Sequence, residues 1–188
     1  MSNHSSNCQW HQVSAALKKY HDQEWGFPTK CPQLLFEKLC LKCLQAGLSW
    51  RTILEKRDAI RQAFAHFDAH QIAQFNAQDI QTWLQNPNII RNRKKIQAII
   101  HNATVVMHIE KNHGSFTQFI WQFKPQKLAQ PLTQPPQEAK ELTQALRQNG
   151  WQFIGETSTY AFMQAAGLIN DHDLNCPIRK LAETAQSH

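Results

Sequence analysis

The sequence predicts an all-α protein, and three observations support this prediction. Apolar residues recur at helical spacing in most segments, most clearly over 89–109. The alternating apolar and polar pattern of a half-buried strand is missing from the sequence. Residues typical of helix ends, such as Ser49 and Asn149-Gly150, separate the periodic segments. We therefore expect helices joined by short loops.

The first half of the chain contains four expected helices, each with its own start or stop signal. Residues 34–47 are rich in Leu and end at a glycine, and Ser49 is suited to cap the helix that follows. Two short helices are expected to start at residues 67–68 and at Asn76. Residues 86–88 (Asn-Pro-Asn) then interrupt the helical pattern, because proline lacks the backbone donor that a helix needs.

The second half continues with helices and one long loop. Residues 89–109 are expected to form a long helix, and residues 114–123 a short aromatic one. The Pro- and Gln-rich segment 124–136 is the expected loop. Helices are expected over 138–147 and 157–168, separated by a turn that is bounded by glycines.

Length, charge and cysteine content limit the class of protein. A chain of 188 residues is expected to form one domain, residues 1–188, with a sizeable core. The five cysteines and the lack of an apolar leader favour a reducing compartment, so we expect a cytoplasmic protein. No apolar stretch reaches the roughly 18 residues of a membrane span, so no membrane partner is expected. The net charge of +6 favours a polyanionic partner.

Four cysteine and histidine side chains suggest a metal site that joins the two ends of the chain. Cys8 and His21 lie near the start, and His172 and Cys176 near the finish. Thiolate and neutral imidazole are both good ligands for tetrahedral Zn²⁺. The spacing alone does not separate this site from cysteines and histidines that bind no metal.

The segment from about 138 to 167 has the order helix, tight turn, helix. In a helix-hairpin-helix, backbone N–H groups of the hairpin and the N-terminus of the next helix bind DNA phosphate, because unpaired donors and the helix dipole point at the anion. An ordinary helix-helix connection explains the same sequence equally well.

Four peptides together resemble the 3-methyladenine DNA glycosylase I family, a branch of the helix-hairpin-helix glycosylases. They are residues 20–26 (YHDQEWG), 45–50 (QAGLSW), 89–100 (IIRNRKKIQAII) and 162–168 (FMQAAGL), followed by Asn170-Asp171-His172. The resemblance covers the chain from about Cys8 to Cys176. It implies the zinc site of Cys8, His21, His172 and Cys176, and a monomer that acts on double-stranded DNA containing alkylated bases. In a bacterial-type cell such an enzyme would associate with the nucleoid.

The resemblance also implies an activity and its site. The family hydrolyses the N-glycosidic bond of a damaged base flipped out of the duplex, without a covalent bond to the sugar. Aromatic faces suit a cationic purine, and an apolar wedge can fill the gap that the flipped base leaves. The matching positions are Trp10, Tyr20, Trp25 and Trp50 for the base, Tyr20 also for catalysis, Leu48 for the wedge, and Gln45, Gly47, Gly155 and Thr157 for DNA. Core packing is the alternative role of the aromatic residues and of Leu48.

Lys42 departs from the family at the position of the glutamate that recognises the base. An ammonium can neither accept a hydrogen bond from the amino edge of adenine nor attract a cationic base. Three outcomes are open: Lys42 turns outward; it is neutral and even attacks the sugar as a lyase would; or it leaves a protein that binds DNA without excising bases. A family tyrosine is also replaced, by Leu17.

Other charged and reactive residues allow two interpretations each. The cluster Arg91, Arg93, Lys94 and Lys95 suits phosphate binding or a solvated face. The pair Cys40 and Cys43 is interpreted as core or pocket lining rather than as a redox pair. Asp171, beside a zinc ligand, is interpreted as the partner of that ligand or as a helix cap.

Three hypotheses follow from the sequence. The first is a zinc-containing DNA glycosylase that acts on alkylated purines, with 3-methyladenine as the expected substrate. The second is a DNA-binding homologue that is weak or silent in catalysis because of Lys42. The third is an unrelated helical zinc protein, which a steep salt dependence of duplex binding would exclude.

Overall fold

The structure is a computed structural model that describes residues 8–126, 132 and 134–186. Within these residues the regular elements are all helices, which confirms the all-α prediction. In this part of the chain no helix is long and apolar enough to cross a membrane. The elements are the 3₁₀ helices η1 (Gln9–Val13) and η2 (Ala65–Phe67), and the α-helices α1 (Ala15–Gln23), α2 (Pro32–Gln45), α3 (Trp50–Ala63), α4 (Ala69–Ile72), α5 (Ala77–Gln85), α6 (Arg93–His113), α7 (Phe116–Trp121), α8 (Gln137–Gln148), α9 (Glu156–Ala165) and α10 (Pro177–Gln186).

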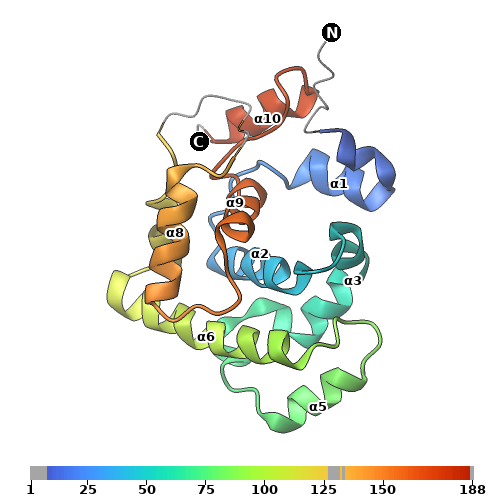
Figure 1. The fold of residues 1–188 in the computed structure, drawn as a ribbon, viewed down its shortest axis with the longest axis vertical. Helices are drawn as coiled ribbons and strands as arrows, with labels where there is room; N and C mark the ends of the chain where they lie inside the picture. Colours follow the sequence, from blue (N-terminus) through green and yellow to red (C-terminus); the bar gives the residue numbers. More distant parts are fainter. Residues whose placement is uncertain (1–7, 127–131, 133, 187–188) are drawn as a thin grey trace.

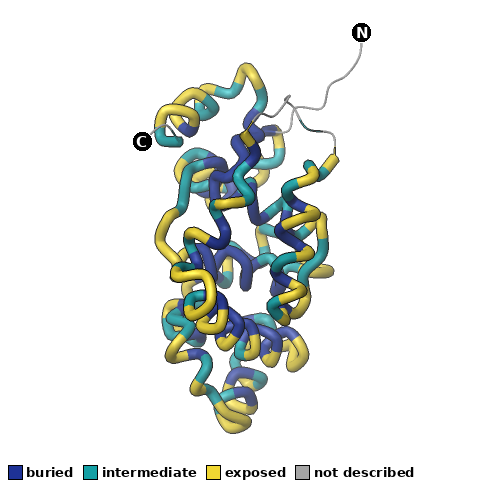
Figure 2. The backbone as a smooth tube through the Cα atoms, turned by 90° about the vertical axis from the view of Figure 1, so that its left-hand side faces the viewer, coloured by how far each residue is buried: buried dark blue, intermediate teal, exposed yellow. Residues whose placement is uncertain are grey.

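Helix α2 lies at the centre of the molecule and contacts α3, α6, α7 and α9 (Figure 1). Because neighbours surround it, α2 buries residues on most of its faces, among them Leu35, Phe36 and Cys40. Burial of a Leu or Phe side chain stabilises the fold by roughly 1.5–3 kcal/mol. In Figure 2, where the backbone is drawn as a tube, buried segments lie mainly in the interior of the molecule and exposed segments on the outside. The hydrophobic core is therefore built around α2.

A buried set of ion pairs holds α1, α2 and α3 together on one side of the core. Arg57 donates from Nε to Glu37 at 2.6 Å and from Nη1 to Glu24 at 2.7 Å. Arg61 also donates to Glu37, at 2.9 Å. Removal of one partner would leave an uncompensated buried charge, which is strongly destabilising. These contacts fix how the three helices face one another.

Several predicted helix boundaries differ from the structure, among them the end of the long helix at His113 rather than 109, and two of the differences have identifiable reasons. The helix expected over 89–109 begins only at Arg93, because the Asn92 side chain accepts a hydrogen bond from the Lys95 N–H and caps the helix there. The helix expected over 157–168 ends at Ala165, because Gly167 has a positive φ of 74°. A Cβ at Gly167 would lie 2.2 Å from the Phe27 carbonyl carbon, so this close approach requires glycine.

The helices η1, α1 and α10 had no individual prediction, and they lie at one end of the molecule, far from α5 (Figure 1). The Gln186 side chain donates to the backbone carbonyls of Gly26 and Gly167, which attaches α10 to the loop after α1. Part of the loop expected over 124–136 lies outside the described residues, because 127–131 and 133 are not among them.

Candidate functional site

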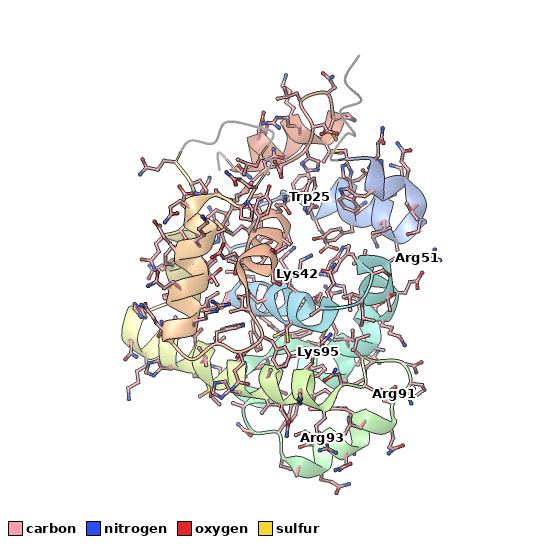
Figure 3. The ribbon with its side chains drawn as sticks, in the orientation of Figure 1. Trp25, Lys42, Arg51, Arg91, Arg93 and Lys95 are labelled. Atoms are coloured by element: carbon pink, nitrogen blue, oxygen red, sulfur yellow. The ribbon has the colours of Figure 1, made fainter. Side chains whose placement is uncertain are left out.

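A pocket of about 640 Å³ opens between α1, α2, α3 and α9. Helix α1 forms one wall and α9 the opposite one, and α2 contributes Lys42, which lies near the centre of the view in Figure 3. The residues that line it are Trp10, Val13, Leu17, Tyr20, Trp25, Lys42, Gln45, Ser49, Trp50, Arg51, Leu132, Tyr160, Ala161, Gln164 and Asp171.

The four aromatic residues assigned to the base from the sequence all line this pocket. The Trp10 and Trp25 rings meet edge to face with centroids 5.4 Å apart, and the Tyr20 and Trp50 centroids are 5.2 Å apart. Such pairs stabilise one another by roughly 0.5–1.5 kcal/mol beyond area burial. The structure places the four rings together, and their role in base binding stays a prediction. Leu17, at the position of a family tyrosine, adds an apolar surface.

Two buried polar atoms of the pocket have no hydrogen-bond partner within the described part of the chain. They are the Tyr20 hydroxyl and the Trp50 Nε1–H. Burial raises the pKa of Tyr20, so its hydroxyl stays protonated. Buried polar groups in native proteins are nearly always hydrogen-bonded. Two buried polar groups without a partner, on side chains that line a cavity, are therefore available to a ligand.

Lys42 points into the pocket, so the outward orientation considered above is wrong. Its ammonium lies 3.6 Å from the centroid of the Trp50 ring and 3.4 Å from Gln45 Oε1. Burial lowers the pKa of Lys42 to about 7, and the positive charges of Lys38 and Arg57 act in the same direction. The lysine is therefore held where a ligand would meet it.

Asp171 is a pocket residue whose place the sequence did not reveal. Its Oδ2 accepts hydrogen bonds from the Tyr160 hydroxyl at 2.5 Å and from Gln164 Nε2 at 2.7 Å. Its interpretation as the partner of a zinc ligand or as a cap is therefore wrong, because the carboxylate binds pocket side chains. Tyr160, Gln164 and Arg51 were also missed, since helical spacing shows that a residue is on a face but not which face meets a cavity.

The turn at the pocket mouth exposes the residue proposed as a wedge. Gly47 has a φ of 79° with open space around it, and the Leu48 side chain is 40% exposed. The Leu48 N–H donates to the Gln45 carbonyl at 2.6 Å and closes the turn. Lys95 supports it by donating to the carbonyls of Leu44 and Ala46, at 2.8 and 2.5 Å.

The basic cluster after the Asn-Pro-Asn break therefore divides into two parts. Lys95 is buried and serves the end of α2, so a phosphate-binding or solvated role for it is wrong. Arg91, Arg93 and Lys94 are exposed, and Figure 3 shows the two arginines away from the pocket centre. Cys40 and Cys43 are both buried, and burial raises the pKa of each thiol, which suits core lining rather than redox chemistry.

The helix, turn, helix order expected for residues 138–167 is present as α8, residues 149–155 and α9. Asn102 of α6 fixes the turn by exchanging two hydrogen bonds with the Gln152 backbone, at 3.1 and 2.8 Å. Gly155 is the N-cap of α9, and Thr157 is exposed in its first turn. Glu156 is also exposed there, which weakens the attraction of this helix end for an anion.

Three of the four proposed metal ligands form a cluster where the two ends of the chain meet. The ligand atoms of Cys8, His21 and Cys176 all lie within 4.8 Å of one another. The ring of His172 is 4.8 Å from that of His21, and its buried Nε2 has no partner among the described residues. Two thiols and an imidazole, with an unpaired buried nitrogen on the neighbouring His172 ring, fit the ligand set of a tetrahedral ion such as Zn²⁺.

The surroundings of the cluster orient its histidines. His21 Nδ1 contacts Asp22 Oδ1 at 2.7 Å, and His172 Nδ1 contacts Asn170 Oδ1 at 2.7 Å, which leaves each Nε2 for a ligand. Burial lowers the pKa of His172 to about 4, so its ring is neutral. Burial raises the pKa of Cys8 to about 12, so a nearby cation is needed to hold its thiolate. Gly26 leaves the space for His172, since a Cβ would lie 2.8 Å from that ring.

Comparison with known proteins identifies the class of this fold and pocket. The structure superposes on a crystal structure of 3-methyladenine DNA glycosylase I with a TM-score of 0.84 and 42% identity, covering 90% of this chain and 97% of the other. The Staphylococcus aureus enzyme, solved to explain 3-methyladenine recognition, gives a TM-score of 0.86 and 35% identity over 92% and 95% of the chains. The class that the fold and site define is thus that of the helical DNA glycosylases.

The sequence comparisons narrow the class to a family. Residues 10–180 match the family model for methyladenine glycosylase. The chain is 41% identical to DNA-3-methyladenine glycosylase of Haemophilus influenzae over 93% of this chain and 98% of the relative. It is also 41% identical to DNA-3-methyladenine glycosylase 1 of Escherichia coli K12, over 90% and 94%. The chain belongs to the methyladenine glycosylase family, as the sequence motifs indicated.

Proposed function

We propose that this protein excises a damaged purine from DNA by hydrolysing its N-glycosidic bond. The observation that supports this proposal best is the pocket with its aromatic walls and the unpaired Tyr20 hydroxyl and Trp50 Nε1. A related enzyme has been solved in complex with 3-methyladenine, which makes that base the first substrate to test. A duplex must deliver its base to the pocket by flipping the nucleotide.

In the proposed reaction the pocket recognises the base more than it forces the chemistry. Methylation at N3 gives adenine a positive charge, so the bond from the sugar C1′ breaks readily and its electron pair passes to the departing base. The oxygen of a water molecule then bonds to C1′, and the proton that this water loses passes to the solvent. The faces of Tyr20 and Trp50 would hold the base, with Trp10 and Trp25 beside them, through cation–π attraction of roughly 0.5–2 kcal/mol per good contact.

Lys42 is expected to weaken the binding of a cationic base. At an effective dielectric near 20, two positive charges about 5 Å apart repel by roughly 3 kcal/mol, which is on the order of a hundredfold in binding. The inward orientation of Lys42 is the specific observation that favours a second candidate function, a DNA-binding homologue with weak or silent excision.

We propose that Leu48 fills the gap left by the flipped base and that backbone around Gln45, Gly47, Gly155 and Thr157 contacts the DNA. The exposure of Leu48 and the position of Gly155 at the start of α9 support this assignment. The net charge of +6 favours the duplex as partner. We further propose that the protein acts as a monomer, in the cytoplasm and at the nucleoid.

The Cys–His cluster is proposed to hold Zn²⁺ through Cys8, His21, His172 and Cys176. A closed set of four protein ligands leaves no position for water or substrate, so the ion would stabilise the fold rather than take part in the reaction. Metal analysis of the purified protein and of Cys8→Ser tests this. We expect one zinc per native chain, and we expect the variant to lose the zinc and to melt at a lower temperature. A native protein without zinc, and a Cys8→Ser variant that melts at the same temperature as the native protein, would contradict the proposal.

The activity is tested by release of free base from N-methylated duplex DNA, with Lys42→Glu as the comparison. Release of 3-methyladenine by the native protein supports the glycosylase. Release by Lys42→Glu about a hundredfold faster than by the native protein, as the repulsion between two positive charges implies, would identify an intact fold weakened at one residue. If neither protein releases base while both bind duplex with a steep salt dependence, the DNA-binding homologue is the better description.

A further inference from the structure

The free polar groups of the pocket are mostly hydrogen-bond donors. The Lys42 ammonium carries three N–H groups, and within the described residues Gln45 Oε1 is its one acceptor. Trp50 Nε1 can only donate, and it is unpaired. Asp171 is an acceptor, and its carboxylate already accepts from Tyr160 and Gln164 through Oδ2 and, at 3.5 Å, from the Leu132 N–H through Oδ1. At Lys42 and Trp50, a base that enters this pocket therefore meets donors.

This donor character conflicts with the edge that adenine presents. The 6-amino group of adenine is itself a donor, so it cannot accept a hydrogen bond from Lys42, whereas a carbonyl at position 6 would accept one. A site built to donate discriminates against a ligand without the acceptor by roughly 10- to 100-fold for one unpaired group. The positive charge of Lys42 adds a further preference for a neutral base over a cationic one.

We propose that Lys42 makes this pocket selective for a neutral purine that carries a carbonyl oxygen at position 6. Hypoxanthine, the deaminated form of adenine, is the simplest damaged base of this kind. The proposal rests on the glycosylase function proposed above and specifies the base on which that function acts.

The chemistry of departure also suits an ammonium at this place. When a neutral purine leaves, the electron pair of the C1′–N9 bond passes to the ring, and negative charge spreads onto O6. A hydrogen bond from Lys42 to O6 stabilises that charge; the water oxygen bonds to C1′, and a proton from that water ends on the base. Preorganised donors aimed at developing charge are the strongest catalytic elements in many enzymes. Although burial lowers the pKa of Lys42 to about 7, the developing charge favours its protonated form.

Guanine shares the 6-carbonyl group, and the cost of base flipping separates it from hypoxanthine. Guanine is held in a stable pair with cytosine, while hypoxanthine that arises from adenine stands opposite thymine as a mispair. Extrusion from the stack costs least for a mismatched or damaged base. Hypoxanthine opposite thymine is therefore the substrate that both the pocket and the duplex favour.

The test compares the native protein with Lys42→Glu and Lys42→Met on three duplexes, containing hypoxanthine opposite thymine, 3-methyladenine, or undamaged guanine. Lys42→Met is the matched control, because methionine keeps an unbranched chain without the charge. We expect the native protein to release hypoxanthine at least 10-fold faster than Lys42→Met. Lys42→Glu should reverse the preference toward 3-methyladenine, and guanine should stay in the duplex.

Several results would overturn the inference. Equal release of hypoxanthine by the native protein and Lys42→Met would show that the ammonium does not recognise the base. If the native protein releases 3-methyladenine but not hypoxanthine, the glycosylase function stands and the proposed selectivity is wrong. The same holds if only Lys42→Glu releases 3-methyladenine and no protein releases hypoxanthine. No release of any base by any of the proteins would overturn both. Covalent trapping of the native protein on DNA by borohydride, with no trapping of Lys42→Met, would show that Lys42 attacks the sugar instead.

A measurement on the native protein alone covers the case in which a variant does not fold. Because Trp10, Trp25 and Trp50 line the pocket, bound free base should change their fluorescence. Hypoxanthine is expected to bind at least 10-fold more tightly than adenine. Equal binding, or tighter binding of adenine, would overturn the inference.

Discussion

Two lysines one turn apart on α2 have opposite surroundings. The ammonium of Lys38 is buried in the structure, where it donates to the Ala165 carbonyl at 2.8 Å and lies 3.8 Å from Glu24. That of Lys42 faces the pocket, with Gln45 and the Trp50 ring as its contacts. Burial lowers both pKa values, to about 8 and about 7, but carboxylates oppose this only at Lys38. The first lysine belongs to the fold, and the second is left for a ligand.

The largest change in stability is expected when the carboxylate that distinguishes Lys38 from Lys42 is removed. Glu24→Gln would leave Lys38 and Arg57 without one of their negative partners, so we expect the free energy of unfolding to fall by about 2 kcal/mol, less than for a fully buried pair because Glu24 is partly exposed. Urea unfolding measures it. Glu55→Gln is the control, since Glu55 forms an exposed pair with Arg51 and should cost less than about 0.5 kcal/mol. Equal losses would contradict the structural role of the ion pairs.

The second prediction concerns Lys42 and pH. Since its pKa is lowered to about 7 from 10.5, the unfolded chain binds a proton between these values that the folded protein does not. Stability of the native protein should therefore rise with pH across this window. Lys42→Met removes the effect and should be more stable by about 1–2 kcal/mol at pH 6, a figure reduced for the partial exposure of the pocket. The difference should shrink toward zero near pH 10.5.

Urea unfolding of both proteins at pH 6, 8 and 10 measures this dependence. A constant difference between native protein and variant across the three values would mean that Lys42 titrates at an ordinary pKa and is not held in the pocket.

The smallest expected effects extend the comparison to two tyrosines of the same pocket. The Tyr20 hydroxyl is unpaired and that of Tyr160 donates to Asp171. Tyr160→Phe should therefore lower the free energy of unfolding by about 1 kcal/mol, whereas Tyr20→Phe should leave it unchanged or slightly higher. Tyr20→Phe should instead weaken base release by roughly 3- to 10-fold, if its hydroxyl contacts the base. Thermal unfolding and base release separate the two; loss of stability in Tyr20→Phe would count against an unpaired hydroxyl.

Local patterns in the sequence predicted the helices well, because caps and apolar spacing are local. Ser49 does cap α3 and Asn76 caps α5, through side-chain bonds to nearby N–H groups. The start of α6 was misjudged because Ile89 and Ile90 continue the apolar pattern, although the Asn92 cap begins the helix three residues later.

The candidate site was harder to predict because it depends on contacts distant in sequence. The family resemblance assigned four aromatic residues to the base, and all four line one pocket. Nothing local shows that Lys42 points inward, that Lys95 serves the end of α2, or that Asp171 pairs with Tyr160. Each of these depends on which helix packs opposite, and helical spacing does not contain that information.

The meeting of Cys8 with Cys176 has a consequence for biosynthesis. Helix α1 and the proposed ligands Cys8 and His21 leave the ribosome long before residues 172–176 exist. At roughly 5–20 residues per second, synthesis of the intervening segment takes on the order of 8–30 s. During that interval Cys8 and His21 cannot complete their cluster, and the pocket wall that α1 provides has no C-terminal attachment. The newborn chain should therefore acquire its central helices first and its pocket last, so that competence to bind a base arrives only with the final residues.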